Sequence, residues 1–214
     1  MAKKRVSLTD NFEEVLKAGD FEAFKALYDK CELNAYYDGR FGLRTALHHR
    51  YINEECARWL VEQGLDINVL DYYGKTPLCE QASNGNDIVE LYYELGGDIN
   101  KPDRYGMTPL HMAADYHHVN TVKFLVANGA DIFAKNDRGW NALHYALMNC
   151  RGIYTVPMVE IAEILLNAGN TITPEIQECV KKLARTLSFI EKTSVREKQK
   201  MLMKLFRRCT SSLW

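Results

Sequence analysis

A short motif recurs four times along this sequence of 214 residues, and its regular spacing constrains the fold more than any other feature. Each copy opens with a threonine or asparagine and has a leucine two positions later, and the copies start at Thr45, Thr76, Thr108 and Asn141. Successive copies lie 31, 32 and 33 residues apart. A fixed period in this range is typical of a solenoid, in which each repeat buries its apolar face against its neighbours.

The stretch Asp103–Phe133 shows most clearly what one repeat is built from. Gly106 permits the positive φ of a tight turn, Thr108 is a natural N-cap, and Pro109 suits the first turn of a helix. An apolar stripe at i, i+3 and i+4 begins at Val122 and indicates a second helix. The stretch therefore predicts a turn followed by two short antiparallel helices.

The core of this stretch, Thr108-Pro109-Leu110-His111, resembles the signature of the ankyrin repeat family. The resemblance implies an all-α solenoid of about five helix-turn-helix repeats, closed by a helical cap. We expect the repeat domain at residues 1–174 and the cap at 175–214. The expected repeats span about 8–35, 38–68, 71–100, 103–133 and 136–172.

Several segments depart from the pattern. Residues 1–7 carry three basic side chains and are expected to be a frayed start, and the first repeat lacks the motif. The second repeat is short, so one of its helices or their connection must be trimmed; we place its first helix at His48–Ile52. The fifth repeat has about seven extra residues, 151–157, which we interpret as a surface loop.

Charge is distributed unevenly, although the net charge is only −1. Residues 175–214 hold ten Lys/Arg against four Asp/Glu, whereas the rest of the chain holds seventeen against twenty-four. We interpret the tail as a cap with a basic amphipathic helix from about Ser194, resting on an acidic body. A partner contact and nucleic-acid binding are the alternatives for this helix, but the tail has few aromatic residues for stacking on bases.

The six cysteines are scattered and form no C-x-x-C pair, which favours reduced thiols used as small packing residues. The sequence has no apolar run long enough to span a bilayer and no apolar secretory signal at its start. We therefore expect a cytoplasmic, monomeric protein without membrane insertion.

No catalytic or cofactor-binding motif is present, including the G-x-S-x-G, P-loop, H-E-x-x-H and G-x-G-x-x-G patterns. Adjacent histidines, as in His48-His49 and His117-His118, diverge by about 100° on a helix and do not form a two-ligand metal site. His111 and His144 are expected to hydrogen-bond the backbone of the turns. We expect no enzyme activity, no cofactor, no metal and no small-molecule substrate.

The turns before the first helices carry aromatic and basic residues, the types enriched at binding hot spots. Some of these aromatics, most readily Tyr105 and Trp140, are also suited to packing between turns. We predict that a protein partner contacts the turn tips and the concave face of the first helices. The predicted contact residues are Phe41, Arg44, Tyr72, Tyr73, Lys75, Asn84, Arg104, Tyr105, Met107, Asp115, Tyr116, Asp137, Arg138 and Trp140.

These patterns together predict a non-catalytic protein-protein interaction module that binds a folded partner. One interpretation is an inhibitor or immunity-type protein, in which binding is itself the activity. The alternative is an adaptor or secreted effector scaffold that links host proteins. A nucleic-acid-associated regulator is the third reading, but the net charge and the sparse aromatics of the tail argue against it.

Overall fold

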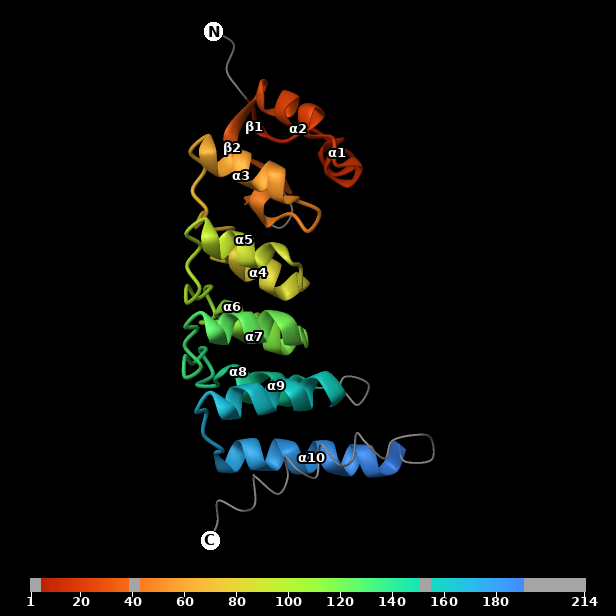
Figure 1. Cartoon of the computed structure of the whole chain (residues 1–214), viewed down its shortest axis with the longest axis vertical. Coiled ribbons are helices and arrows are strands. Elements are labelled where there is room, and N and C mark those ends of the chain that lie inside the picture. Colours follow the sequence, from red (N-terminus) through yellow and green to blue (C-terminus); the bar gives the residue numbers. More distant parts are fainter. Residues whose placement is uncertain (1–4, 39–42, 151–154, 191–214) are drawn as a thin grey trace. The chain divides into compact units, whose positions relative to one another are not determined.

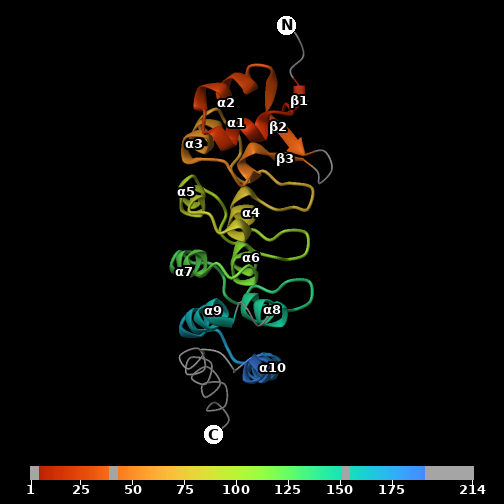
Figure 2. The ribbon, with the colours of Figure 1, turned by 90° about the vertical axis from the view of Figure 1, so that its right-hand side faces the viewer.

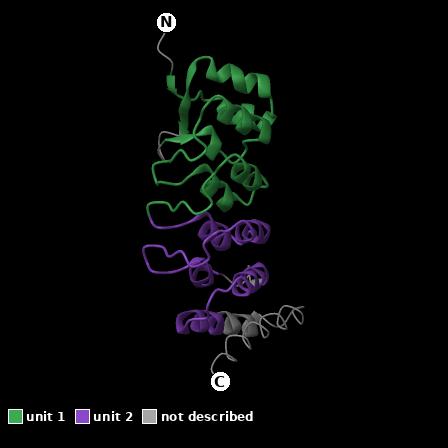
Figure 3. Ribbon diagram, turned by 60° about the vertical axis from the view of Figure 1, so that its left-hand side comes forward, with its two compact units in different colours: residues 1–104 green, residues 105–214 purple. Residues whose placement is uncertain are grey.

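The computed structural model describes residues 5–38, 43–150 and 155–190, and short helices dominate this part of the chain (Figure 1). The chain divides into two compact units, residues 1–104 and 105–214 (Figure 3). Residues 151–154 of the expected surface loop 151–157 lie outside the described residues, whereas 155–157 form the first turn of a helix, so the loop expected there was wrong for these three residues. The basic helix expected from about Ser194 lies wholly outside the described residues.

The first unit contains the first three repeats. Its elements are β1 (Arg5–Ser7), α1 (Phe12–Ala18), α2 (Phe21–Tyr28), β2 (Cys31–Asp38), β3 (Arg44–Thr45), the 3₁₀ helix η1 (Ala46–His48), α3 (Glu54–Glu62), α4 (Pro77–Asn84) and α5 (Ile88–Glu94). Large side chains from successive elements fill its core, including Phe24, Leu47, Leu60, Leu78 and Tyr92, each less than 2% exposed. The core therefore runs continuously from one repeat to the next, as a solenoid requires.

A small three-stranded sheet, in the order β1-β2-β3, shows that the expectation of an all-α fold was wrong. Strand β2 pairs in parallel with β1 and antiparallel with β3, with Tyr36 opposite both Ser7 and Thr45. Residues 5–7 are thus a strand and not a frayed start. Only part of β2, such as Tyr36 and Tyr37, is made of strand-forming residues; the strand is held by pairing on both of its edges and by the burial of Cys31 and Ala35.

The helix expected at His48–Ile52 is also absent. The chain makes only the single 3₁₀ turn η1 before Asn53 caps α3 by accepting a hydrogen bond from the Cys56 amide at 2.9 Å. The trimmed element of the second repeat is therefore its first helix. Eight residues, 46–53, lie between Thr45 and α3, against ten, 109–118, between Thr108 and α7, so the second repeat has less chain for its first helix.

The second unit contains the fourth and fifth repeats and a closing helix. Its elements are α6 (Pro109–Asp115), α7 (Val119–Ala127), α8 (Ala142–Asn149), α9 (Thr155–Asn167) and α10 (Pro174–Ile190). Helix α6 packs against α7 and α8, and α8 packs against α9 and α10 (Figure 2). Leu110, Leu125, Leu143, Ile161 and Ile176 are among its fully buried side chains.

The recurring threonine or asparagine caps the first helix of a repeat wherever that helix forms. The side chains of Thr76, Thr108 and Asn141 accept hydrogen bonds from the amides three residues later. In the fourth repeat the His111 side chain also bonds the Thr108 amide, which completes a capping box. The prediction of Thr108 as an N-cap is confirmed.

The cysteines of the described chain are all free thiols, and Cys31, Cys56, Cys79 and Cys179 are buried. Burial raises the pKa of Cys56 to about 12, so this thiol is protonated and unreactive at neutral pH. Within the described residues, no helix is both long enough and apolar enough to cross a bilayer.

Candidate protein-binding surface

The turns before α4 and α8 are each braced from inside by one buried side chain. In the third repeat, Asp71 Oδ1 accepts hydrogen bonds from the amides of Tyr73 and Lys75 at 2.8 and 2.9 Å. In the fifth repeat, Asn136 Oδ1 accepts from the amides of Arg138 and Trp140 at 3.0 and 3.1 Å. We refer to residues 71–75, 103–107 and 136–140 as the third, fourth and fifth tips. Their internal hydrogen bonds fix their shape before any partner arrives.

Neighbouring tips are joined by backbone hydrogen bonds. In the first unit the Arg104 amide donates to the Tyr73 carbonyl at 2.9 Å, and in the second unit the Asp137 amide donates to the Tyr105 carbonyl at 3.0 Å. Gly106, with φ of +74°, permits this close approach, because an added Cβ would lie 2.9 Å from the Asn136 Cα. The tips are therefore a stacked, rigid array within each unit.

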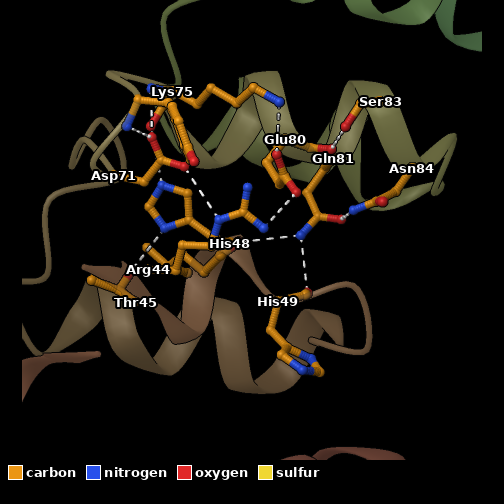
Figure 4. Close-up of polar contacts among 12 residues, drawn as sticks. Arg44, Thr45, His48, His49, Asp71, Lys75, Glu80, Gln81, Ser83 and Asn84 are labelled. Atoms are coloured by element: carbon orange, nitrogen blue, oxygen red, sulfur yellow. Dashed lines mark hydrogen bonds and ion pairs between the residues drawn. The ribbon is translucent and has the colours of Figure 1, made fainter. Parts of the chain in front are cut away.

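Arg44 and Lys75, two predicted contact residues, belong to an ion cluster under the third tip (Figure 4). Arg44 bonds Asp71 at 3.2 Å and Glu80 at 3.1 Å, and Lys75 Nζ lies 3.2 Å from Glu80. Burial disfavours the charged form of Arg44, but Glu80 with Tyr37 and Asp71 raises its pKa overall. Both cations are already paired, so they hold the tip in place more than they offer charge to a partner.

The third tip presents an aromatic pair to solvent. Tyr72 is 54% exposed and its ring lies edge-on to that of Tyr73, which is half-buried. The Arg104 guanidinium lies 5.0 Å from the Tyr72 ring centroid, a cation-π distance. These three predicted residues form one surface patch, the Tyr72 patch, in the first unit.

The second unit exposes aromatic residues on its tips and at the end of α6. Tyr105 is 57% exposed and Tyr116 is 55% exposed. Arg138 lies over the Trp140 ring at 5.3 Å, while the other contacts of that half-buried ring are with His144 and Tyr145. Both aromatics were expected to pack between turns; these ring contacts of Trp140 are instead within its own repeat, and Tyr105 is largely exposed.

The remaining predicted residues fall in different environments. Asp115 is half-buried and accepts a hydrogen bond from Asn149 at 2.8 Å, and burial raises its pKa although Asn149 opposes the shift. Asn84 is half-buried and donates to Gln81, and Asp137 is exposed. Met107 is only 6% exposed, so its placement on the surface was wrong; its sulfur accepts from Asn136 beneath the fourth tip. Phe41 lies outside the described residues.

Sequence reasoning missed exposed apolar residues away from the tips. Phe133 is 55% exposed and Leu70 is 46% exposed, both on the connection that leads to the next tip. A signal was available for Phe133: Ile67, Ile99 and Ile132 follow an aspartate at the same place in three repeats and are buried, which predicts that the next residue points outward. Leu70 is not at such a position.

A pocket of about 350 Å³ lies beside the fifth tip in the second unit. It is lined by Lys135, Arg138, Gly139, Trp140, Asn141, His144, Thr173, Glu175 and Ile176. A smaller pocket of about 270 Å³ in the first unit lies between α2, β2 and α3. Across the described residues, no group of three or more His, Cys, Asp or Glu side chains is arranged to hold a metal ion.

Braced turns with exposed aromatic and basic side chains, present in each unit, define a repeat protein equipped for macromolecular recognition. The family model described as ankyrin repeats (3 copies) matches residues 13–103 and 81–178. The chain therefore belongs to the ankyrin repeat family, whose repeats generally mediate protein-protein interactions.

Among curated proteins, the chain is similar to the human SH3 and multiple ankyrin repeat domains protein 2. The two are 36% identical over 104 residues, which is 47% of this chain but only 6% of that protein. The chain thus corresponds to a small part of that relative's length.

Proposed function

We propose that this protein is a non-catalytic binding module that holds a folded protein partner against its turn tips and first-helix face. The observation that carries the proposal is the Tyr72 patch: an exposed tyrosine, a second tyrosine and an arginine on a turn already braced by buried hydrogen bonds. Tyrosine and arginine on a preorganised surface contribute contact area at little ordering cost.

The second unit supports the same function with its own residues. Tyr105 and Tyr116 are exposed, and Arg138 covers Trp140 on the fifth tip. Asp115 lies beside Tyr116 at the end of α6, where it adds a polar contact to the aromatic surface. We propose that these residues and Asp137 contact the same partner as the Tyr72 patch.

We further propose that binding is itself the activity, so that the module occludes a functional surface of its partner. The support is the rigidity of the tips, because a surface that changes little on binding suits tight, one-to-one occlusion. An adaptor instead holds two proteins at once. A complex that contains two different partners on one copy of this chain would favour the adaptor reading.

The decisive experiment compares exposed aromatics on the tips with exposed aromatics elsewhere. Partners are first identified by affinity capture with the wild-type protein and mass spectrometry. The affinity of each partner is then measured for two double variants, Tyr72→Ala/Arg104→Ala and Tyr105→Ala/Tyr116→Ala. Each tip variant should weaken binding by about tenfold or more. Tyr93→Ala and Phe133→Ala, which remove exposed aromatics outside the tips, are the matched controls and should bind normally. Equal losses of affinity in the tip variants and in the control variants would refute the assignment of the binding surface to the tips.

A further inference from the structure

The junction between the fourth and fifth tips shows how one tip receives the next. The incoming turn, residues 137–140, uses two main-chain groups: the Asp137 amide donates to the Tyr105 carbonyl, and the Trp140 carbonyl lies 3.0 Å from His111 Nε2. The receiving surface therefore consists of a carbonyl on the tip and a histidine three residues after the helix cap. Any turn with an amide and a carbonyl at this spacing fits it.

The fifth tip carries Arg138 and His144 at the positions of Tyr105 and His111, but within the described residues no further turn packs on it. The connection from α9 to α10 is short and lacks the projecting loop that precedes α8 (Figure 2). Gly106 and Gly139 both have φ of +74°, yet their surroundings differ. A Cβ on Gly106 would meet the fifth tip at 2.9 Å, whereas one on Gly139 meets no described atom within 4 Å.

The groups that would receive a sixth tip are accordingly left open. In the described part of the chain, neither ring nitrogen of His144 forms a hydrogen bond, and the Arg138 carbonyl accepts none from the backbone. Both border the pocket of about 350 Å³ beside Trp140 and the start of α10. We call this pocket the sixth-tip slot.

We propose that the sixth-tip slot receives a turn of the partner protein, which donates an amide to the Arg138 carbonyl and presents a carbonyl to His144 Nε2. This inference rests on the proposed binding function and assigns it a specific subsite. The partner thereby supplies a turn that the described residues do not place in this slot.

The charges of the slot indicate what such a turn carries. Lys135 and Arg138 form no ion pair with any described residue, and they outnumber the one carboxylate of the slot, Glu175, whose pKa is lowered by a hydrogen bond with the Thr173 side chain. Burial lowers the pKa of His144, with Glu175 opposing, so its imidazole is neutral at pH 7 and a ring N–H can donate to a carbonyl. The occupant is therefore a turn with an acidic side chain, packed against the Trp140 ring.

The chain provides its own probe for the slot. A cyclic peptide with the sequence of residues 136–141 copies the turn that fills the fourth-to-fifth junction and carries an aspartate at its first docking position. Binding to the full chain is followed by NMR titration of the Gly139 and Trp140 amides. The wild-type protein should bind the peptide saturably, with shifts confined to residues around the slot.

Two protein variants and one peptide variant test the geometry. Gly139→Asn fills the slot while tolerating the left-handed backbone, and His144→Ala removes the imidazole. N-methylation of the aspartate amide removes the peptide's donor. Each change should weaken binding by about tenfold or more, which corresponds to about 1.4 kcal/mol. Lys123→Ala, on the exposed side of α7, is the control and should leave binding unchanged.

No saturable binding, or binding that survives both Gly139→Asn and His144→Ala in folded protein, would overturn the proposal. A concentration-dependent dimer that Gly139→Asn abolishes would assign the slot to a second copy and also overturn it. If Gly139→Asn captures the natural partner normally while the Tyr72 and Arg104 variants do not, the binding function stands and only the slot assignment fails.

Discussion

The second and fourth repeats open with almost the same four residues but continue differently. Thr45-Ala46-Leu47-His48 makes a single 3₁₀ turn, whereas Thr108-Pro109-Leu110-His111 starts the seven-residue helix α6. In both repeats the threonine hydroxyl lies within 3.2 Å of the histidine Nδ1, and the histidine Nε2 bonds a carbonyl of the following tip. The motif therefore fixes the turn and its link to the next repeat, but not the helix.

The difference lies in what satisfies the backbone carbonyls after the turn. In the second repeat, side chains of the third repeat replace the missing helical bonds: Gln81 donates to the carbonyls of Leu47 and His49, and Tyr92 donates to that of Leu47 at 2.7 Å. The position five residues after the helix cap is Gln81 in α4 but Ala146 in α8, which packs against the full helix α6. A lost helix is thus compensated by polar side chains of its neighbour.

Among the variants that test this comparison, Gln81→Leu should change the free energy of unfolding most. The variant removes the Gln81 donor from the carbonyls of Leu47 and His49, which keep only the Tyr92 hydroxyl and the Ile52 amide, respectively. It also removes the acceptor of the Asn84 and Asn86 side chains, so the free energy of unfolding should fall by about 2–4 kcal/mol. Urea denaturation followed by circular dichroism measures the change. Gln63→Leu, an exposed glutamine in the same unit, is the control, and equal effects of the two would contradict the compensation.

Removing the threonine hydroxyl from each of the two turns should give smaller losses of stability, which should differ between the turns. Thr108→Val loses a capping box and should cost about 1–2 kcal/mol. Thr45→Val loses only the contact with His48, because Thr45 caps no helix, and should cost less than about 1 kcal/mol. Thermal or urea unfolding of both variants tests the order. A reversed order would mean that η1 depends on its threonine more than α6 does.

Acidification should weaken the second repeat. Burial lowers the pKa of His48 below its ordinary 6.5, with the Lys75 carbonyl, Asp71 and Glu80 opposing, and burial likewise lowers the pKa of His49. The unfolded chain therefore takes up protons that the folded chain does not, so stability is complete above about pH 6.5 and declines as the pH falls below it. His48→Gln should flatten this decline between about pH 7 and 5. An unchanged slope would assign the decline to other groups.

The smallest change in stability is expected from Ala46→Pro, which places a proline where the fourth repeat has Pro109. Proline suits the first position after a cap, so stability should shift by no more than about 1 kcal/mol. Helix content by circular dichroism should stay the same, because Gln81 and Tyr92 still hold the carbonyls of the 3₁₀ turn. A gain in helix would show that the local sequence, not the neighbouring repeat, decides the length of this element.

The sequence predicted the elements whose signals are local. Three of these elements lie within one repeat: the Thr108 cap, the helix that begins at Pro109 and the apolar stripe from Val122. Their signals do not depend on the neighbouring repeats. The strands were missed because β2 is stabilised by pairing with β1 and β3, which lie far from it in the chain or beyond a turn. The family period also led us to expect a helix after Thr45, where too few residues precede α3.

The candidate surface was predictable by residue type but not by exposure. Tyr105 and Met107 flank the same glycine, yet one is 57% exposed and the other 6% exposed. Arg44 and Lys75 looked like free cations, but two buried or half-buried carboxylates from the third repeat neutralise them. Residue types at a tip therefore identify candidates, and only packing separates contact residues from supporting ones.

The sequence by itself determined the period, the caps and the turns, because these depend on backbone preferences and on contacts within a few residues. The tertiary structure decided the small sheet, the shortened helix of the second repeat and the open slot beside the fifth tip. Each of these depends on which groups a neighbouring repeat supplies or fails to supply. A buried carbonyl must find a donor, and whether that donor is the next turn of a helix, Gln81 or a partner is settled only when the repeats stack.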